Sequence, residues 1–113
     1  MSGISTHVLD TSIGRPAAGV PVTLEALSGA GFVGISRGAT DANGRIAQLL
    51  PAGTALAPGF YRLNFDTAAY FDARGVAWFF PHVAIVFGVA DAAQHYHVPL
   101  LLSPFGYSTY RGS

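Results

Sequence analysis

The sequence predicts an all-β fold, an antiparallel β-sandwich of seven to eight strands with one short helix. Three observations support this fold class. Apolar and polar residues alternate along several short segments, which is typical of strands that bury one face. Turn-forming glycine, proline and asparagine residues separate these segments. Only one segment of the 113 residues has the features of a helix, so the strands must form most of the core among themselves.

Two segments show the alternation most clearly. In the first, Val22 and Leu24 share one side of a strand while Thr23 and Glu25 share the other, and residues 61–65 follow the same pattern. We therefore expect strands at residues 4–10, 20–26, 32–37, 45–50, 61–65, 83–89, 95–102 and 107–111.

Asn43-Gly44 is the strongest local turn signal in the chain. Both residue types tolerate a positive φ angle, which a type I′ hairpin turn requires at its two central positions. The sequence therefore predicts a type I′ turn that delivers Arg45 to the start of the strand at residues 45–50.

The helical segment is short and covers residues 67–73. Asp66 or Thr67 can cap its N-terminus through a side-chain oxygen. Gly75 lies just beyond its C-terminus, where glycine is favoured. We expect this segment to be the helix of the sandwich.

Length and composition indicate one domain, residues 1–113, because a chain of this size has no room for a second core. Half of the residues are hydrophobic and only 11% are charged, which leaves apolar surface for subunit contacts to cover. We therefore expect an oligomer.

The N-terminus shows no secretory signal, and no apolar segment is long enough to span a bilayer. These features predict a cytoplasmic protein without membrane contact.

The composition of the chain argues against several classes of function. All six basic residues are arginines, scattered along a chain of zero net charge, which disfavours nucleic-acid binding. The chain has no lysine for a Schiff base and no cysteine for a thiol nucleophile or a disulfide. These absences narrow the chemistry that the chain can perform.

His95 and His97 are two residues apart on a predicted strand, so both project from one face while Tyr96 projects from the other. The pair is half of a zinc site, or two ordinary strand histidines, or the source of a base, since a neutral imidazole accepts a proton near pH 7. No third ligand has an evident spacing and cysteine is absent, so we expect no metal and no cofactor.

Three stretches of the chain resemble one known family. The stretches are Ser5-Thr6-His7-Val8-Leu9-Asp10 followed by Gly14-Arg15-Pro16-Ala17, then Thr40-Asp41-Ala42-Asn43-Gly44-Arg45, and last the segment from His95 to Ser113, which ends in Tyr110-Arg111-Gly112-Ser113. In this order and spacing they resemble the 5-hydroxyisourate hydrolases, the transthyretin-related enzymes of urate breakdown. The resemblance covers almost the whole chain and implies a transthyretin-like (prealbumin-like) sandwich.

The resemblance also implies an active site and a reaction. It assigns catalysis to His7, Arg45, His97 and Ser113, and substrate binding to His7, Arg45, Tyr110 and Arg111. The family reaction is the hydrolysis of 5-hydroxyisourate, in which water attacks a cyclic amide carbonyl and opens the six-membered ring to give 2-oxo-4-hydroxy-4-carboxy-5-ureidoimidazoline. We expect His7 and His97, with Ser113 nearby, to deprotonate the water, while Arg45 binds the substrate and stabilises charge on the carbonyl oxygen. Either histidine could be the base.

A further implication of the resemblance is a homotetramer, a dimer of dimers, with active sites in clefts where subunits meet. The last four residues place Arg111 and the Ser113 hydroxyl beside the C-terminal carboxylate. They follow a predicted strand and turn directly, so we expect this end to be docked against the domain.

Two other function classes stay open. Transthyretin shares the sandwich and carries thyroid hormones, so a small-molecule carrier without catalysis is the main alternative. A carrier of apolar aromatic hormones gains little from His7, His97 and Arg111, and an immunoglobulin-like interaction module is disfavoured by the absence of a cysteine pair.

The chain departs from the family at His82, where an acidic residue is usual, and at Phe105, where tyrosine is common; we expect neither to be catalytic.

Overall fold

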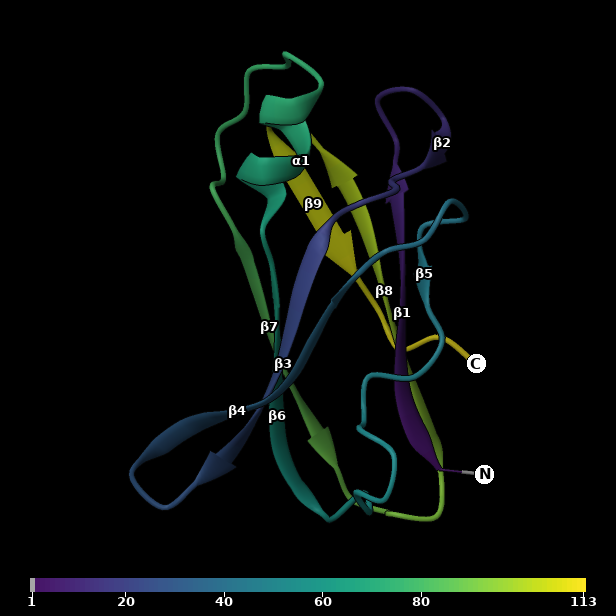
Figure 1. The fold of residues 1–113 in the computed structure, drawn as a ribbon, viewed down its shortest axis with the longest axis vertical. Helices are drawn as coiled ribbons and strands as arrows, with labels where there is room; N and C mark the ends of the chain where they lie inside the picture. The colour runs from purple at the N-terminus through teal and green to yellow at the C-terminus, as the bar shows by residue number, and fades with distance from the viewer. Residues whose placement is uncertain (1) are drawn as a thin grey trace.

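Two β-sheets pack face to face in the computed structural model, which describes residues 2–113, and a short helix lies at one end of them (Figure 1). Within these residues, no helix is long and apolar enough to cross a membrane. The elements in chain order are β1 (Gly3–Asp10), β2 (Arg15–Pro16), β3 (Pro21–Ser28), β4 (Gly31–Ala39), β5 (Arg45–Ile46), β6 (Gly59–Phe65), α1 (Thr67–Ala73), β7 (Val83–Val89), β8 (His95–Ser103) and β9 (Gly106–Thr109).

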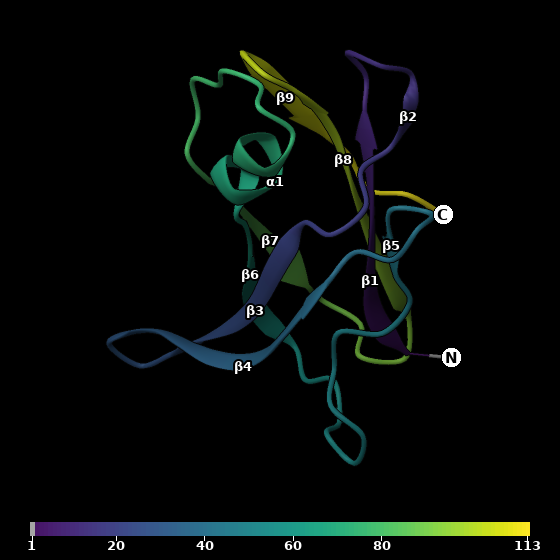
Figure 2. The ribbon, with the colours of Figure 1, turned by 45° about the horizontal axis from the view of Figure 1, so that its top comes forward.

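The first sheet has the order β2-β1-β8-β9, with β5 also pairing with β1, and the second has the order β4-β3-β6-β7. Every strand pair is antiparallel except that of β1 and β8, which run parallel. Figure 2 shows the two sheets at an angle, with β5 against β1. The predicted all-β sandwich with one short helix is confirmed, and the parallel pair is a feature that the alternation did not predict.

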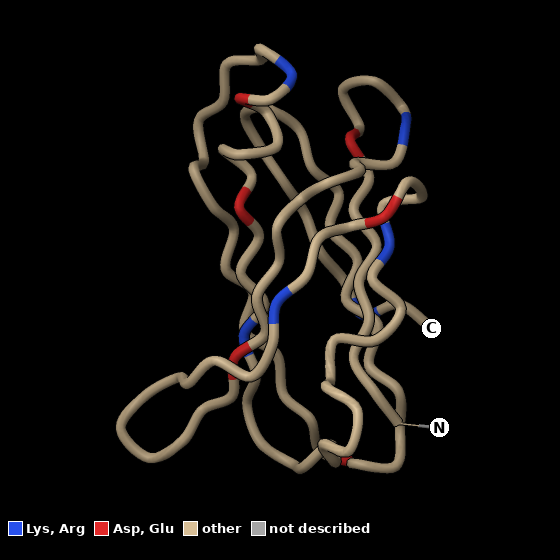
Figure 3. Tube along the Cα trace, viewed as in Figure 1, with Lys and Arg blue, Asp and Glu red and all other residues tan. Residues whose placement is uncertain are grey.

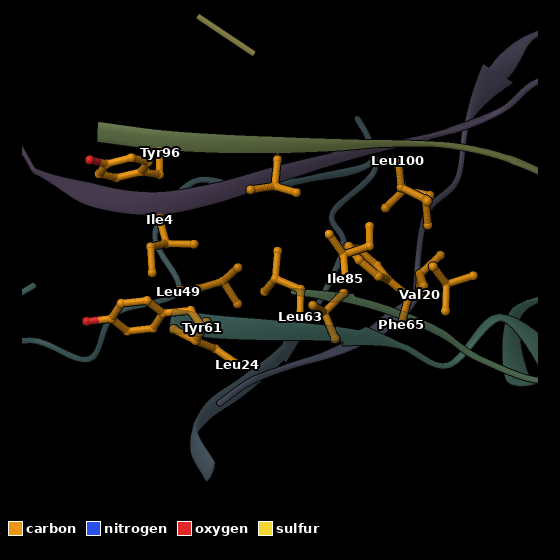
Figure 4. Close-up of a cluster of buried hydrophobic side chains, with 14 of the residues drawn as sticks. Ile4, Val20, Leu24, Leu49, Tyr61, Leu63, Phe65, Ile85, Tyr96 and Leu100 are labelled. Carbon is orange, nitrogen blue, oxygen red and sulfur yellow. The ribbon is translucent and has the colours of Figure 1, made fainter. Parts of the chain in front are cut away.

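The hydrophobic core lies between the inner faces of the two sheets (Figure 4). Ile4 and Leu100 enter it from the first sheet, and Leu24, Leu63 and Phe65 enter it from the second; all five side chains are fully buried. Burial of a side chain of this size stabilises the fold by about 1.5–3 kcal/mol. Successive residues of a strand point to opposite faces. In β1 and β8, the residues that alternate with the core residues therefore lie on the outer face of the first sheet.

The helix α1 begins and ends where the sequence predicts. Asp66 is the N-cap, since its Oδ1 accepts a hydrogen bond of 3.0 Å from the backbone N–H of Ala69. Tyr70 fixes the helix to the first sheet, because its hydroxyl donates to Oδ2 of the buried Asp10 at 2.8 Å. Burial, with this hydrogen bond, raises the pKa of Tyr70 to about 12.

The strand β5 is shorter than expected. It covers only Arg45–Ile46, so the prediction of a strand through residue 50 was wrong. The side-chain Oε1 of Gln48 accepts hydrogen bonds of 3.1 Å from the backbone N–H groups of Ile4 and Leu50. The side-chain amide of Gln48 thus accepts from the Ile4 N–H in place of a backbone carbonyl, and the regular strand pairing stops before it.

The turn before β5 differs from the predicted type. Gly44 has a φ angle of +74°, but Asn43 does not have a positive φ, so the type I′ prediction was wrong. The N–H of Gly44 donates to the carbonyl of Asp41 at 2.9 Å, and Oδ1 of Asp41 accepts from the N–H groups of Asn43 and Arg45 at 2.8 and 2.9 Å. This pattern fits a three-residue loop with glycine in the left-handed position. The turn still delivers Arg45 to the start of β5, as predicted.

Candidate active site

The outer face of the first sheet carries a group of polar side chains from both ends of the chain. His95 and His97 on β8 are half-buried and flank Tyr96, which points into the core and is 5% exposed. The prediction that the two histidines share one face is therefore confirmed. The parallel register places Ser5 of β1 opposite His97, so these two side chains lie on the same face of the sheet.

The short strand β5 adds an arginine to this face. Its antiparallel pairing with β1 places Arg45 opposite His7, and directly opposed residues in a ladder have neighbouring side chains. Arg45 is exposed and His7 is half-buried. A guanidinium here can present parallel N–H donors to the oxygens of a planar anion, and it keeps its charge at every physiological pH.

The C-terminal segment returns to the same region. The strand β9 ends at Thr109, two residues earlier than predicted, and Gly112 then bridges to His97, its N–H donating to the His97 carbonyl at 2.9 Å. No side chain fits at position 112, because a Cβ atom there would lie 2.5 Å from Cδ2 of His97. Figures 1 and 2 show the C-terminus beside β5 and β1. The expectation of a docked end is confirmed.

These segments surround a surface pocket of about 310 Å³. Three of the four predicted catalytic residues, Arg45, His97 and Ser113, line it together, and His7 lies beside them opposite Arg45. The full lining consists of Ser5, Thr6, Arg45, Ile46, Ala47, His95, His97 and Ser113. The fold thus gathers polar groups from residue 5, residue 45 and the C-terminal segment.

The two other predicted substrate-binding residues lie outside this pocket in the part of the chain that the structure describes. Nη2 of Arg111 donates to Oε1 of Gln94 at 2.8 Å, and its guanidinium carbon lies 4.5 Å from the centre of the Tyr96 ring. Such a contact is a cation–π interaction, and it holds Arg111 toward the side of β8 opposite to His97. Tyr110 is 57% exposed.

Ser5 was not predicted as a site residue, yet its hydroxyl joins the two histidines of β8. The Ser5 Oγ lies 2.7 Å from Nε2 of His95 and 2.8 Å from Nδ1 of His97. Ser5 is 8% exposed, so these hydrogen bonds are partly buried. Its spacing from His7 was the available signal, because residues two apart on a strand share a face.

The surroundings of His97 favour a neutral imidazole. Burial lowers the pKa of His97 from its ordinary value of 6.5, and the nearby charges of Arg45, His7 and His95 lower it further, against a smaller opposite effect of a hydrogen bond with the backbone of Ser5. His97 is therefore unprotonated near pH 7, which is the state in which an imidazole can accept a proton.

The histidine pair does not form part of a recognisable metal site. Among residues 2–113, no three His, Cys, Asp or Glu side chains gather where they could hold a metal ion. His95 and His97 instead share one serine hydroxyl. Their geometry is that of a hydrogen-bonded chain, which suits the positioning and transfer of a proton.

The two departures from the family pattern lie away from the pocket. His82 is exposed just before β7, in the second sheet, and Phe105 is 68% exposed in the turn between β8 and β9. That neither residue is catalytic stays a prediction.

Several known proteins are similar to this chain over nearly its whole length. The HIUase/Transthyretin family model matches residues 4–112. The 5-hydroxyisourate hydrolase of Salmonella typhimurium is 47% identical over 110 residues, which cover 97% of this chain and 80% of that protein. The solved structure of Klebsiella pneumoniae 5-hydroxyisourate hydrolase has a TM-score of 0.87 at 39% identity and covers 100% of both chains. The crystal structure of transthyretin from Sparus aurata has a TM-score of 0.89 at 32% identity, covering 99% of this chain and 97% of that one.

Proposed function

The chain belongs to the HIUase/Transthyretin family, and from this premise we propose that it is an enzyme that hydrolyses 5-hydroxyisourate in urate degradation. The observation that carries the proposal is the pocket that joins Arg45, Ser113 and a neutral His97. In the reaction, water opens the six-membered ring at a cyclic amide and gives 2-oxo-4-hydroxy-4-carboxy-5-ureidoimidazoline.

The pocket supplies the groups that hydrolysis of a cyclic amide needs. A base must take a proton from the attacking water, and a positive group must stabilise the charge that develops on the carbonyl oxygen. His97 is the base, because its lowered pKa keeps it unprotonated. Arg45 binds the substrate and stabilises the oxygen, while His7 and the Ser113 hydroxyl position the water.

The bonds change in two steps. Water adds to the carbonyl carbon, so that a C–O bond forms while His97 takes a proton. The C–N bond of the ring then breaks, and His97 returns the proton to the leaving nitrogen. Since the sequence contains no lysine or cysteine, direct attack by water is favoured over a covalent intermediate on one of those residues.

A carrier function is the alternative that the fold alone leaves open, because transthyretin has the same sandwich. The side chains of the pocket decide against it. Arg45, His95, His97 and two serine hydroxyls line the space, whereas a site for an apolar aromatic hormone gains most from hydrophobic walls.

The function is tested by making 5-hydroxyisourate in situ from urate and urate oxidase and following its ultraviolet absorbance. We expect its decay to accelerate in proportion to the concentration of this protein. The control is the same mixture without the protein, which gives the spontaneous rate. Folded protein that leaves the decay at the spontaneous rate would contradict the proposal, and a ligand screen for a carrier would follow.

We propose further that the enzyme is a homotetramer, a dimer of dimers, with sites near subunit contacts. Large hydrophobic side chains support this assembly, since Phe60, Val86 and Tyr107 are 56%, 55% and 44% exposed. Tyr110 and Arg111 stay predicted substrate-binding residues on the strength of the family resemblance, and they belong to the segment that brings Ser113 to the pocket. Sedimentation velocity should give the mass of four chains of 11.8 kDa each; a fully active monomer would contradict the proposal.

The remaining partners and the compartment are proposals from the sequence. Figure 3 shows arginine, aspartate and glutamate at separate positions along the backbone, and a chain of zero net charge with scattered arginines is a poor candidate for nucleic-acid binding. The mechanism uses no cofactor. A cytoplasmic location stays a prediction.

A further inference from the structure

The hydroxyl of Ser5 occupies a position that limits the protonation states of two histidines. It lies within hydrogen-bond distance of one ring nitrogen of each, at 2.7 Å from Nε2 of His95 and 2.8 Å from Nδ1 of His97. A serine hydroxyl carries one proton and can donate only one hydrogen bond, although it can accept others. If the hydroxyl proton is shared between these two rings, one histidine accepts from Ser5 while the other donates to it.

Two arrangements satisfy this condition when both imidazoles are neutral. In the first, Ser5 donates to Nε2 of His95 and accepts from a protonated Nδ1 of His97, which leaves Nε2 of His97 without a proton. In the second, Ser5 donates to Nδ1 of His97 and accepts from His95, which puts the His97 proton on Nε2. Only the first arrangement leaves His97 a free lone pair with which to act as a base.

The charges around His97 favour the neutral imidazole that both arrangements require. Arg45 of β5 lines the same pocket, and its positive charge contributes to the lowered pKa of His97. The other groups that face the ring are His7 of β1, His95 of its own strand and Ser113 of the C-terminal segment. The positive potential of the guanidinium disfavours a second proton on the ring, so one ring nitrogen keeps its lone pair.

The backbone of the C-terminal segment also restricts the ring. Gly112 packs so closely on His97 that a Cβ atom there would lie 2.5 Å from Cδ2. With Nδ1 bonded to Ser5 and the Cδ2 side covered by Gly112, the imidazole is held on two sides. Nε2 is then the ring nitrogen left for a reactant.

We propose that Ser5 is a positioning residue whose hydroxyl donates to Nε2 of His95 and accepts from Nδ1–H of His97, so that Nε2 of His97 stays free to take a proton from water. The role of that nitrogen in hydrolysis rests on the proposed function. Ser5 itself acts through His97 and contacts no reacting atom.

The tautomer is tested on the protein alone by ¹⁵N NMR of histidine-labelled protein near pH 7.5. We expect His97 to show a protonated Nδ1 and an unprotonated Nε2, with the His97→Gln spectrum assigning its signals. A His97 proton on Nε2 would overturn the inference. Because this measurement needs no substrate and no Ser5 variant, neither the absence of turnover nor a misfolded variant affects its outcome.

The kinetic test compares variants that differ in one hydroxyl. One hydrogen bond stabilises by about 0.5–1.5 kcal/mol, so Ser5→Ala should lower kcat by up to about tenfold, with KM little changed. Ser5→Thr keeps a hydroxyl and should restore most of the loss, and Ser28→Ala, an exposed serine at the end of β3, is the matched control. Unchanged kcat and an unchanged His97 spectrum in Ser5→Ala would contradict the inference. Wild-type protein with the expected tautomer but no turnover would support the inference and contradict the proposed function.

Discussion

Replacing His97 by glutamine should lower kcat for 5-hydroxyisourate hydrolysis by about 10²–10⁴-fold, the range that a positioned general base contributes. Glutamine keeps a side chain of similar reach that can hydrogen-bond but cannot take up a proton near neutral pH. The fold should persist, since His97 is half-buried on the outer face and outside the hydrophobic core. The assay is the ultraviolet decay of substrate generated in situ, at saturating and at low concentration.

The matched control for this variant is His82→Gln, which removes an exposed imidazole from the other sheet. Its kcat should equal that of the wild type. Near-normal turnover of His97→Gln would remove His97 from the mechanism and leave His7 as the candidate base.

The pH dependence of kcat/KM in the wild type is an independent test of His97 as the base. The pKa of His97 is lowered from 6.5, first by burial and then by neighbouring charges. The active form is the neutral one, so kcat/KM should fall as the pH is lowered, with the midpoint of this acid limb below 6.5. An acid limb centred at 6.5 or above would contradict this assignment.

Replacing Arg45 by glutamine should lower kcat/KM by about 10²–10³-fold, the cost of removing one group that stabilises the developing oxyanion. A second effect should accompany the loss. The charge of Arg45 contributes to the lowered pKa of His97, so its removal should raise that pKa and move the acid limb of the profile to higher pH. The measurement is kcat/KM between pH 5 and 8 for both proteins.

Two further variants separate charge from shape. Arg45→Lys should restore the position of the acid limb, because the charge returns, but only part of the rate, since an ammonium group lacks the planar fork of donors. Arg37→Gln, an exposed arginine of β4, should change neither quantity. An acid limb that stays in place in Arg45→Gln would show that the guanidinium does not act on His97.

Local sequence patterns predicted much of the fold because they reflect local physics. The bounds of α1 follow from capping at Asp66, and β7 coincides with a short apolar segment of the sequence; both match the structure. The end of β5 could not be predicted in this way. It depends on the amide of Gln48 reaching Ile4, a contact between residues 44 positions apart.

For the site too, features within one strand could be predicted from the sequence, and contacts between distant strands could not. Alternation placed His95 and His97 on one face, and the family resemblance named Arg45, His97 and Ser113, which the fold brings together. Strand patterns reveal which face a residue takes but not which strand lies beside it, so the pairing of Ser5 with His97 stayed hidden. The position of Arg111 was equally hidden, because it follows from a cation–π contact with Tyr96.

The parallel pairing of β1 with β8 also determines when the site can form during synthesis and folding of the chain. Ser5 and His97 are 92 positions apart, so no short segment contains both halves of the site. On the ribosome, β1 emerges early and can pair with β2 and β5, but its parallel neighbour β8 is synthesised only near the end of the chain. Pairings with large sequence separation form slowly, since the chain loses loop-closure entropy before the contacts stabilise it. Activity should therefore be among the last properties that a newly made chain acquires.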